Sequence, residues 1–250
     1  MGKNGRGGEG TGGAREAGRA GEGTGYAEDT GYGEDTGYGE EDGRLTLRER
    51  KKLRTRQRIS GEATLLFIER GFDNVTVAEV ARAAEVSTMT VFNYFPRKED
   101  LFLDRIPEAH ELVTRAVRER GADETPLAAL RRLAFALLAR RHPLGGVGEG
   151  FAHFWQTVLD SPALRARGRE AVEEIENTLA GLLGEAAGEE GGPGDARLAA
   201  ALIVAAYRVA YAGAAVRQLA GDPADEVAAD QEAVLRRTFD ALERALPGGG

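Results

Sequence analysis

The amino-acid sequence predicts an all-α fold in which a three-helix unit precedes a larger helical domain. Apolar residues after position 44 recur at helical spacing, and capping signals precede several of these segments. No segment alternates with period two for long enough to predict a sheet. The 250 residues are enough for two ordinary domains. We therefore expect a head at 1–43, a first helical domain at 44–105 and a second one at 106–250.

The head differs from the rest of the chain in composition. It holds 16 of the 35 glycines and carries ten acidic against four basic side chains. A six-residue unit recurs in it three times, as GYAEDT from Gly25, GYGEDT from Gly31 and GYGEED from Gly37. A segment without Val, Ile or Leu cannot bury enough apolar surface to offset the loss of chain entropy. The composition therefore predicts a disordered head.

Composition and charge narrow the function. The absence of cysteine excludes disulfides, thiolate metal sites and cysteine nucleophiles. The first residues lack the apolar run of a signal peptide, so we expect a cytoplasmic protein. The net charge is −8, yet residues 44–58 hold eight basic residues and one acid. Because charges are screened over about 8 Å, this local excess decides what the segment attracts, and a polyanion is the expected partner.

The basic run opens the first predicted helix. Thr46 and Glu49 have the spacing of a capping box, and Gly71 supplies a C-terminal stop. One face of the helix carries the apolar residues Ile59, Ala63, Leu66 and Phe67. Like charges four residues apart destabilise a helix by a few tenths of a kcal/mol unless an anion neutralises them. The expected phosphate contacts are Arg48, Lys52 and Arg58. A merely solvated helix face is the alternative.

Two short helices follow between residues 76 and 95. Thr76 and Glu79 form a second capping box, and Ser87 is placed to cap the next helix. Neither helix is long enough to be stable alone, so both need the helix that contains Ile59 to pack on. Two short helices with a tight connection, packed on a third, have the geometry of a helix-turn-helix DNA-binding unit.

The second short helix would place its exposed side chains in the major groove of DNA. The amide of Asn93 has the donor and acceptor that bind adenine, while Thr88 and Met89 offer methyl groups to thymine. Further phosphate contacts are expected from Thr76, Thr90, Tyr94 and Lys98. Phosphate contacts position a protein on DNA without recognising its sequence. The threonines and Asn93 could instead be ordinary surface residues, and Met89 could pack internally.

Three motifs lie close together here: ATLLFIERGF at 63–72, the helix-turn-helix at 76–95 and YFPRKEDL at 94–101. With them, residues 59–101 resemble the DNA-binding domain of the TetR family of bacterial repressors. The resemblance implies an all-helical homodimer whose C-terminal domain binds a small-molecule effector and releases operator DNA. Glu85 stands where the family usually has glycine in the turn, and Phe92 where it has a phosphate-binding tyrosine. We therefore expect ordinary helical dihedrals in the turn and a phosphate contact at Tyr94.

The second domain shows further helix boundaries. Capping residues stand before a proline in Thr125-Pro126, Ser161-Pro162 and Asp222-Pro223. Asp195 is expected to open a helix after a glycine-rich loop. Pro107 falls inside the helix expected from Lys98 onward and should kink or end it. It marks either a plain helix boundary or a hinge that passes motion from ligand to DNA.

The segment Leu198–Val216 is almost wholly apolar. A membrane span is disfavoured because Arg208 near its centre would cost roughly 2.5–3.5 kcal/mol. We expect a buried helix and no contact with a membrane. Together with the segment Pro223–Ala245 it would form the four-helix dimer interface that the resemblance implies. The same two-fold symmetry is required by a palindromic operator.

A pocket for a small molecule would lie in the second domain. Aromatic and polar residues cluster on two segments there and could together line an apolar cavity with a few polar groups. The candidate ligand-binding residues are His153, Trp155, Tyr207, Arg208 and Tyr211. Aromatic residues at helical spacing are more often part of a core, and Arg208 could equally pair with a carboxylate across the dimer.

Neither a catalytic nor a metal site is predicted. The dinucleotide-like GEGTGG at 8–13 lies in the head without a preceding strand, no Gly-Lys-Ser/Thr phosphate loop is present, and the chain has only three histidines. We therefore expect no enzyme and no cofactor. The main alternative to a DNA-binding regulator is a helical interaction module. Its basic helix would bind an acidic partner, for example residues 22–42 of its own head.

Overall fold

The fold is entirely helical in the part of the chain that the structure describes. This computed structural model describes residues 46–188 and 192–246, and no strand occurs among them. The α-helices are α1 (Leu47–Arg70), α2 (Val77–Ala83), α3 (Thr88–Tyr94), α4 (Glu99–Phe102), α5 (Ile106–Arg118), α6 (Pro126–Ala139), α7 (Phe151–Asp160), α8 (Pro162–Ala187), α9 (Pro193–Leu219) and α10 (Ala224–Ala245). The predicted all-α fold is confirmed, and the predicted disorder of the head lies outside the described residues.

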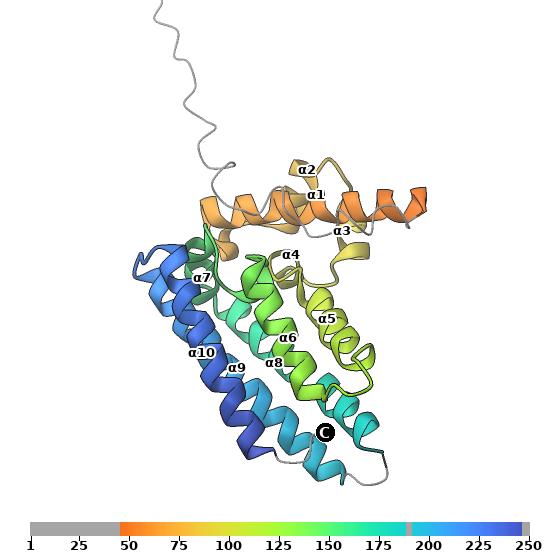
Figure 1. The fold of residues 1–250 in the computed structure, drawn as a ribbon. Helices are drawn as coiled ribbons and strands as arrows, with labels where there is room; N and C mark the ends of the chain where they lie inside the picture. Colours follow the sequence, from red (N-terminus) through yellow and green to blue (C-terminus); the bar gives the residue numbers. More distant parts are fainter. Residues whose placement is uncertain (1–45, 189–191, 247–250) are drawn as a thin grey trace, which may run out of the picture.

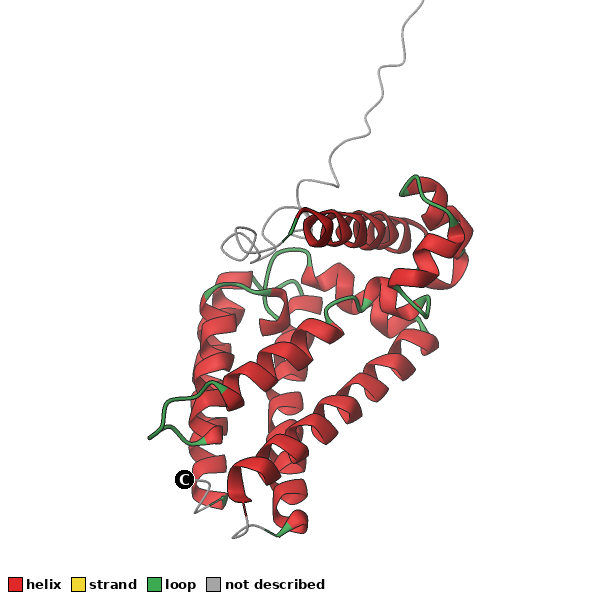
Figure 2. Ribbon diagram, turned by 90° about the vertical axis from the view of Figure 1, so that its right-hand side faces the viewer, coloured by secondary structure: helices red, strands yellow, loops and turns green. Residues whose placement is uncertain are grey.

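Helices α1 to α4 lie at one end of the molecule, and the helical bundle makes up the rest. Figure 1 shows α1 lying across one end of a bundle that contains α5, α6, α8, α9 and α10. In that bundle α9 packs against both α8 and α10, while α5 packs against α6 and α8. The view in Figure 2 shows the same arrangement after a quarter turn. Two short 3-10 helices, η1 (Phe72–Asn74) and η2 (Pro143–Gly145), lie in the connections.

Buried side chains form two clusters. The first, here called the N-terminal core, is built from residues of α1 to α4 and the loops between them, including Ile59, Phe67 and Phe95. The second, here called the bundle core, is built from α5, α6 and α8 to α10 with the connection at 147. Leu164 of α8 is fully buried in the N-terminal core, so the bundle contributes to it. The domain boundary expected near residue 105 remains a prediction.

Five predicted helix starts are confirmed by their hydrogen bonds. In each case the side chain of the capping residue accepts a hydrogen bond from a backbone N–H in the first turn of its helix. These capping residues are Thr46, Thr76, Ser87, Thr125 and Ser161. All five bonds span three residues, which is why the sequence alone could indicate them.

Other predicted boundaries are wrong. Asp222 does not cap α10, because its carboxylate instead accepts a hydrogen bond of 2.6 Å from Nε of Arg217. The ninth helix begins at Pro193 rather than at Asp195, which lies in its first turn. The helix expected from Lys98 already ends at Phe102. Pro107 therefore lies in the first turn of α5, where a missing N–H costs nothing, and marks a helix boundary.

Helix α9 is only partly buried in the single chain. By length and composition it is the one helix among the described residues that could cross a membrane, with a mean hydropathy of 1.6. The core helix of a soluble protein can meet the same criterion. Within one chain the helix is buried on one side only, because four large apolar residues on the other side are exposed: Leu198, Leu202, Val209 and Val216. Their spacings of four and seven residues place them on one stripe, here called the α9 face.

Candidate nucleic-acid interface

The entry to α2 is fixed by reciprocal hydrogen bonds. The hydroxyl oxygen of Thr76 accepts from the backbone N–H of Glu79 at 3.3 Å. In return Oε2 of Glu79 accepts from the backbone N–H and the hydroxyl of Thr76, at 2.9 and 2.8 Å. These bonds from the backbone and hydroxyl of Thr76 lower the pKa of Glu79. The hydroxyl of Thr76, a predicted phosphate contact, thus already has partners within the protein.

The turn between α2 and α3 differs from the prediction. Glu85 has a φ of +50°, in the left-handed region, so the expectation of ordinary helical dihedrals is wrong. The backbone N–H of Val86 donates to the carbonyl of Ala81 at 2.9 Å, and that of Glu85 to the carbonyl of Arg82 at 3.2 Å. These two bonds are those of a Schellman motif, which usually places glycine where Glu85 lies. The turn thus has a left-handed residue at Glu85 and accepts the strain of its Cβ atom.

Helix α3 exposes one side and buries the other. Ser87 accepts a hydrogen bond of 3.0 Å from the N–H of Thr90, and the hydroxyl groups of these two residues lie 2.8 Å apart. Val91 is buried. The three predicted base contacts, Thr88, Met89 and Asn93, are all exposed, and Met89 is 69% exposed. The structure therefore brings these three residues together on the solvent side of a helix with a fixed start.

Phe92 lies on the same exposed side of α3. The sequence pattern did not predict this exposure. Its ring is 46% exposed although it is an aromatic residue beside a packed core. Met89 and Phe92 are three residues apart and therefore adjacent on the helix surface. The signal that could have indicated this is the position of Val91, since only one side of so short a helix can face the core.

Lys98 lies against the protein rather than free in solvent. Its Nζ atom donates to the carbonyl oxygen of Phe72 at 2.6 Å and lies 4.2 Å from the centroid of the Phe72 ring. Partial burial lowers the pKa of Lys98, with nearby Asp73 opposing this effect. An ammonium group has three N–H donors, so the predicted phosphate contact would have to use the remaining two. Tyr94, the other predicted contact in this region, is half-buried.

The basic run forms the first three turns of α1, residues 47–58, here called the basic arm. None of its residues is buried, and the buried residues of α1 begin at Ile59. The predicted phosphate contacts Arg48, Lys52 and Arg58 are all exposed. In Figure 1 the N-terminal end of α1, in the deepest orange, projects past α3. Arg56 is different, because it donates to the backbone carbonyl of Asp104 and lies 4.7 Å from the Phe95 ring centroid.

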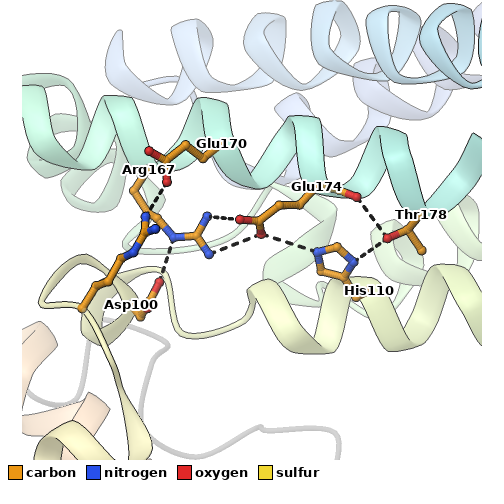
Figure 3. Close-up of polar contacts among 7 residues, drawn as sticks. Asp100, His110, Arg167, Glu170, Glu174 and Thr178 are labelled. Carbon is orange, nitrogen blue, oxygen red and sulfur yellow. Dashed lines mark hydrogen bonds and ion pairs between the residues drawn. The ribbon is translucent and has the colours of Figure 1, made fainter.

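An ion-pair network holds this region on the bundle (Figure 3). Arg167 of α8 donates from Nε to Asp100 of α4 at 2.8 Å, and from NH1 to Glu174 at 3.0 Å. Its side chain is only 11% exposed. The other carboxylate oxygen of Glu174 lies 3.8 Å from Nε2 of His110, whose Nδ1 is 3.0 Å from the hydroxyl of Thr178. Arg97, directly after α3, pairs in addition with Glu170 of α8.

The five predicted ligand-binding residues do not gather around one cavity. Trp155 contacts Tyr211 edge to face at 5.3 Å, and Tyr211 stacks on Tyr207 at 5.9 Å between ring centroids. His153 and Arg208 are exposed. His153 lines a cleft of about 420 Å³ between α7 and the end of α1, away from these three rings. Successive helix residues are rotated by about 100°, so positions two apart face opposite sides. The structure therefore does not bring His153 and Arg208 together with the other three residues, and the ligand-binding role of all five stays a prediction.

The three aromatic residues are packed closely. The hydroxyl of Tyr207 donates to the carbonyl of Leu144 at 3.3 Å, and burial raises the pKa of Tyr207 to about 12. Burial also raises the pKa of Tyr211. A Cβ atom at Gly146 would lie 2.1 Å from the Tyr211 ring, so only glycine fits there. Within the described residues, Nε1 of Trp155 is buried without a hydrogen-bond partner.

Two short capped helices packed across a third are the arrangement of a helix-turn-helix domain. Comparison with known proteins shows what this part of the chain is similar to. Residues 61–104 match the family model described as bacterial regulatory proteins, tetR family. TcmR, an HTH-type transcriptional regulator of Streptomyces glaucescens, is 36% identical over 141 residues, which are 55% of this chain and 62% of TcmR. BetI, an HTH-type transcriptional regulator of Pseudomonas aeruginosa, is 31% identical over 107 residues, 41% of this chain and 54% of BetI.

This N-terminal part of the chain is thus similar to the tetR family of bacterial regulatory proteins. The chain spans about half to three fifths of the length of the two curated relatives. Among solved structures, SmeT in its complex with triclosan is similar over 78% of this chain and 94% of SmeT. The TM-score is 0.52 at 17% sequence identity, so this likeness concerns the fold.

Proposed function

We propose that this chain is a cytoplasmic, sequence-specific regulator of transcription that binds double-stranded DNA. The observation that carries the proposal is the exposed side of α3. Thr88 and Asn93 offer polar groups there, and Met89 and Phe92 offer apolar surface. A helix that served only to cover a core would not leave Met89 69% exposed. Such a mixture suits the edges of base pairs in the major groove.

The proposal divides the interface into two kinds of contact. Asn93 would bind an adenine, and Thr88, Met89 and Phe92 would lie against thymine methyl groups. Charged residues of the basic arm, with the hydroxyl groups of Thr90 and Tyr94, would hold phosphates. Thr76 and Lys98 would contribute less, because both already have partners within the protein.

The active form is proposed to be a homodimer joined through the α9 face. Four large apolar residues form this stripe, and Val209 alone is 74% exposed. Small residues, Ala205, Ala212 and Gly213, lie between them and would allow a second helix to approach closely. Contiguous apolar surface of this kind marks an interface in a soluble protein. A two-fold axis through it would present two copies of α3 to a palindromic operator.

The regulator is further proposed to be a repressor that a small molecule releases from DNA. TetR-family relatives support this, and SmeT was solved with triclosan bound. The rings of Trp155, Tyr207 and Tyr211 are the best candidate contacts in this chain, because the unpartnered N–H of Trp155 could donate to a ligand. An effector of this type would be an aromatic molecule with a hydrogen-bond acceptor.

Selection from random double-stranded DNA, followed by footprinting, tests the proposed function. We expect a palindrome whose half-sites are about 34–36 Å apart, protected by a dimer. If about eight phosphates are contacted, the logarithm of the affinity should fall with the logarithm of the salt concentration at a slope near −7. Recovery of random sequence together with a slope near zero would refute DNA recognition.

A further inference from the structure

The basic arm carries five exposed basic side chains on its surface. No carboxylate in the described ranges 46–188 and 192–246 forms an ion pair with them: Arg48, Lys51, Lys52, Arg54 and Arg58. The acid of the arm is Glu49, and its carboxylate is already held by the backbone and hydroxyl groups of Thr46 at 2.8 and 2.7 Å. The positive charge of these five side chains is therefore not compensated by an ion pair within the described part of the chain.

The charge pattern makes the isolated arm weak as a helix. Arg48 repels Lys51 and Lys52, and Arg54 repels Arg58, because residues three or four apart are neighbours on a helix surface. Each such pair costs a few tenths of a kcal/mol. No residue of the arm is buried, and the five exposed basic residues belong to neither hydrophobic core, so core packing offsets little of this repulsion. An anion alongside the arm would stabilise it in the free protein as well as on DNA.

The segment next to the arm in the sequence has the opposite charge. Residues 22–42 contain eight acidic side chains and no basic one, and they end five positions before α1 begins. Six of the acids form three pairs at the six-residue period of the repeat: Glu28-Asp29, Glu34-Asp35 and Glu40-Glu41. The segment thus offers repeated carboxylates, as a DNA strand offers repeated phosphates.

The length of the chain allows the two segments to meet. The basic arm, 47–58, is roughly 17 Å long at a rise of about 1.5 Å per residue. A Gly-rich chain of about 10–20 residues has a root mean square span of roughly 16–27 Å. Attachment to the same chain gives such a segment an effective concentration on the order of millimolar at the arm. Weak ion pairing is enough for substantial occupancy at that concentration.

We propose that residues 22–42 dock on the basic arm of the same chain and compete with DNA phosphates for it. The competition with DNA rests on the proposed DNA-binding function, whereas the docking itself does not. The repeat then acts as a built-in polyanion that lowers the affinity for all DNA, and rising salt weakens the competition.

The test replaces the six paired acids by amides in the full chain, as E28Q, D29N, E34Q, D35N, E40Q and E41Q. The matched control makes the same change in net charge at six exposed acids outside any ion pair of the described residues. These are Glu119, Asp123, Glu149, Glu173, Asp195 and Glu226, each changed to its amide. Because both variants lose six negative charges, a difference between them reports position rather than net charge.

The first readout needs no DNA. Amide hydrogen exchange over residues 48–58 should be several times faster in the head variant than in the parent chain, and unchanged in the control. Equal exchange in all three proteins would overturn the docking. Because no DNA is present, this result is independent of whether the proposed function holds.

The second readout is DNA affinity on one fixed duplex. At about 50 mM salt the head variant should bind roughly three- to tenfold more tightly than the parent, and near 200 mM the difference should fall below about twofold. An equal gain in the control would show an effect of net charge and overturn the competition. Faster exchange without a gain in affinity would likewise overturn it while leaving the selection experiment unaffected.

Discussion

The N-terminal core and the bundle core differ in how completely a single chain buries their apolar side chains. The members of the N-terminal core are at most 4% exposed and include four phenylalanines, Phe67, Phe72, Phe95 and Phe102. The bundle core is built mostly from Ala, Leu and Val, and several of its members are 6–8% exposed. Four large apolar side chains remain exposed on α9 alone.

This difference indicates whether each core needs a second chain to bury its apolar surface. Aromatic side chains carry a large apolar area and fill the space between short helices, so a small unit can be closed by one chain. The long helices of the bundle pack on one side and leave the α9 face without a partner. The helix-turn-helix unit is therefore closed as a fold, whereas the bundle would be closed by the second copy proposed above.

The largest effect is expected from Val209→Glu, which places a charge in the α9 face. A carboxylate in the middle of a buried helix pair is unpaired and desolvated, so we expect the molar mass from light scattering to halve. DNA affinity should fall at least about 100-fold because one subunit holds only one half-site. Leu159→Glu, at an exposed leucine outside the stripe, is the control and should remain dimeric. A dimeric Val209→Glu protein would remove the α9 face from the interface.

Arg167→Met tests the link between the two cores. It leaves the carboxylates of Asp100 and Glu174 without their partner in a site where Arg167 is 11% exposed. Urea unfolding should show a loss of about 1–3 kcal/mol. Arg236→Met removes an exposed ion pair with Glu232 and should cost less than about 0.5 kcal/mol. Equal losses would mean that the network adds nothing beyond surface pairing.

Asn93→Ala tests the exposed side of α3, the helix that packs on the N-terminal core through Val91. If the amide binds one adenine in each half-site, the preference at that base should relax at a cost of about 1–3 kcal/mol. Lys52→Ala is the comparison, because loss of a phosphate contact should weaken all sequences alike and reduce the salt slope. A uniform loss across sequences for both variants would exclude Asn93 from base recognition.

The smallest effect, a gain in stability, is expected from Glu85→Gly in the turn between α2 and α3. Glycine relieves the strain of the positive φ, and the greater freedom of the unfolded chain removes part of that benefit. We expect a gain of about 0.5–1 kcal/mol, seen as a small rise in Tm. Glu85→Ala keeps the Cβ atom and should bring no gain. An equal rise for both would assign the effect to the lost carboxylate instead.

The sequence predicted what depends on neighbouring residues. The caps at Thr76 and Ser87 involve partners three residues away, so pattern and structure agree. The pairing of Arg167 with Asp100 joins residues 67 positions apart and has no local signal. Arg208 lies apart from Tyr207 and Tyr211 because the direction of a side chain on its helix does not follow from residue type alone. Asp222 failed as a cap because Arg217 competes for its carboxylate.

The unpartnered indole N–H described above also makes this protein its own optical probe. Trp155 is the single tryptophan of the chain, and its ring lies between Phe154 and Tyr211, at 5.2 and 5.3 Å from their centroids. Indole emission shifts to longer wavelength as its surroundings become more polar. All tryptophan fluorescence therefore reports on one point between α7 and α9. A compound that accepts a hydrogen bond there would change the emission spectrum without any label.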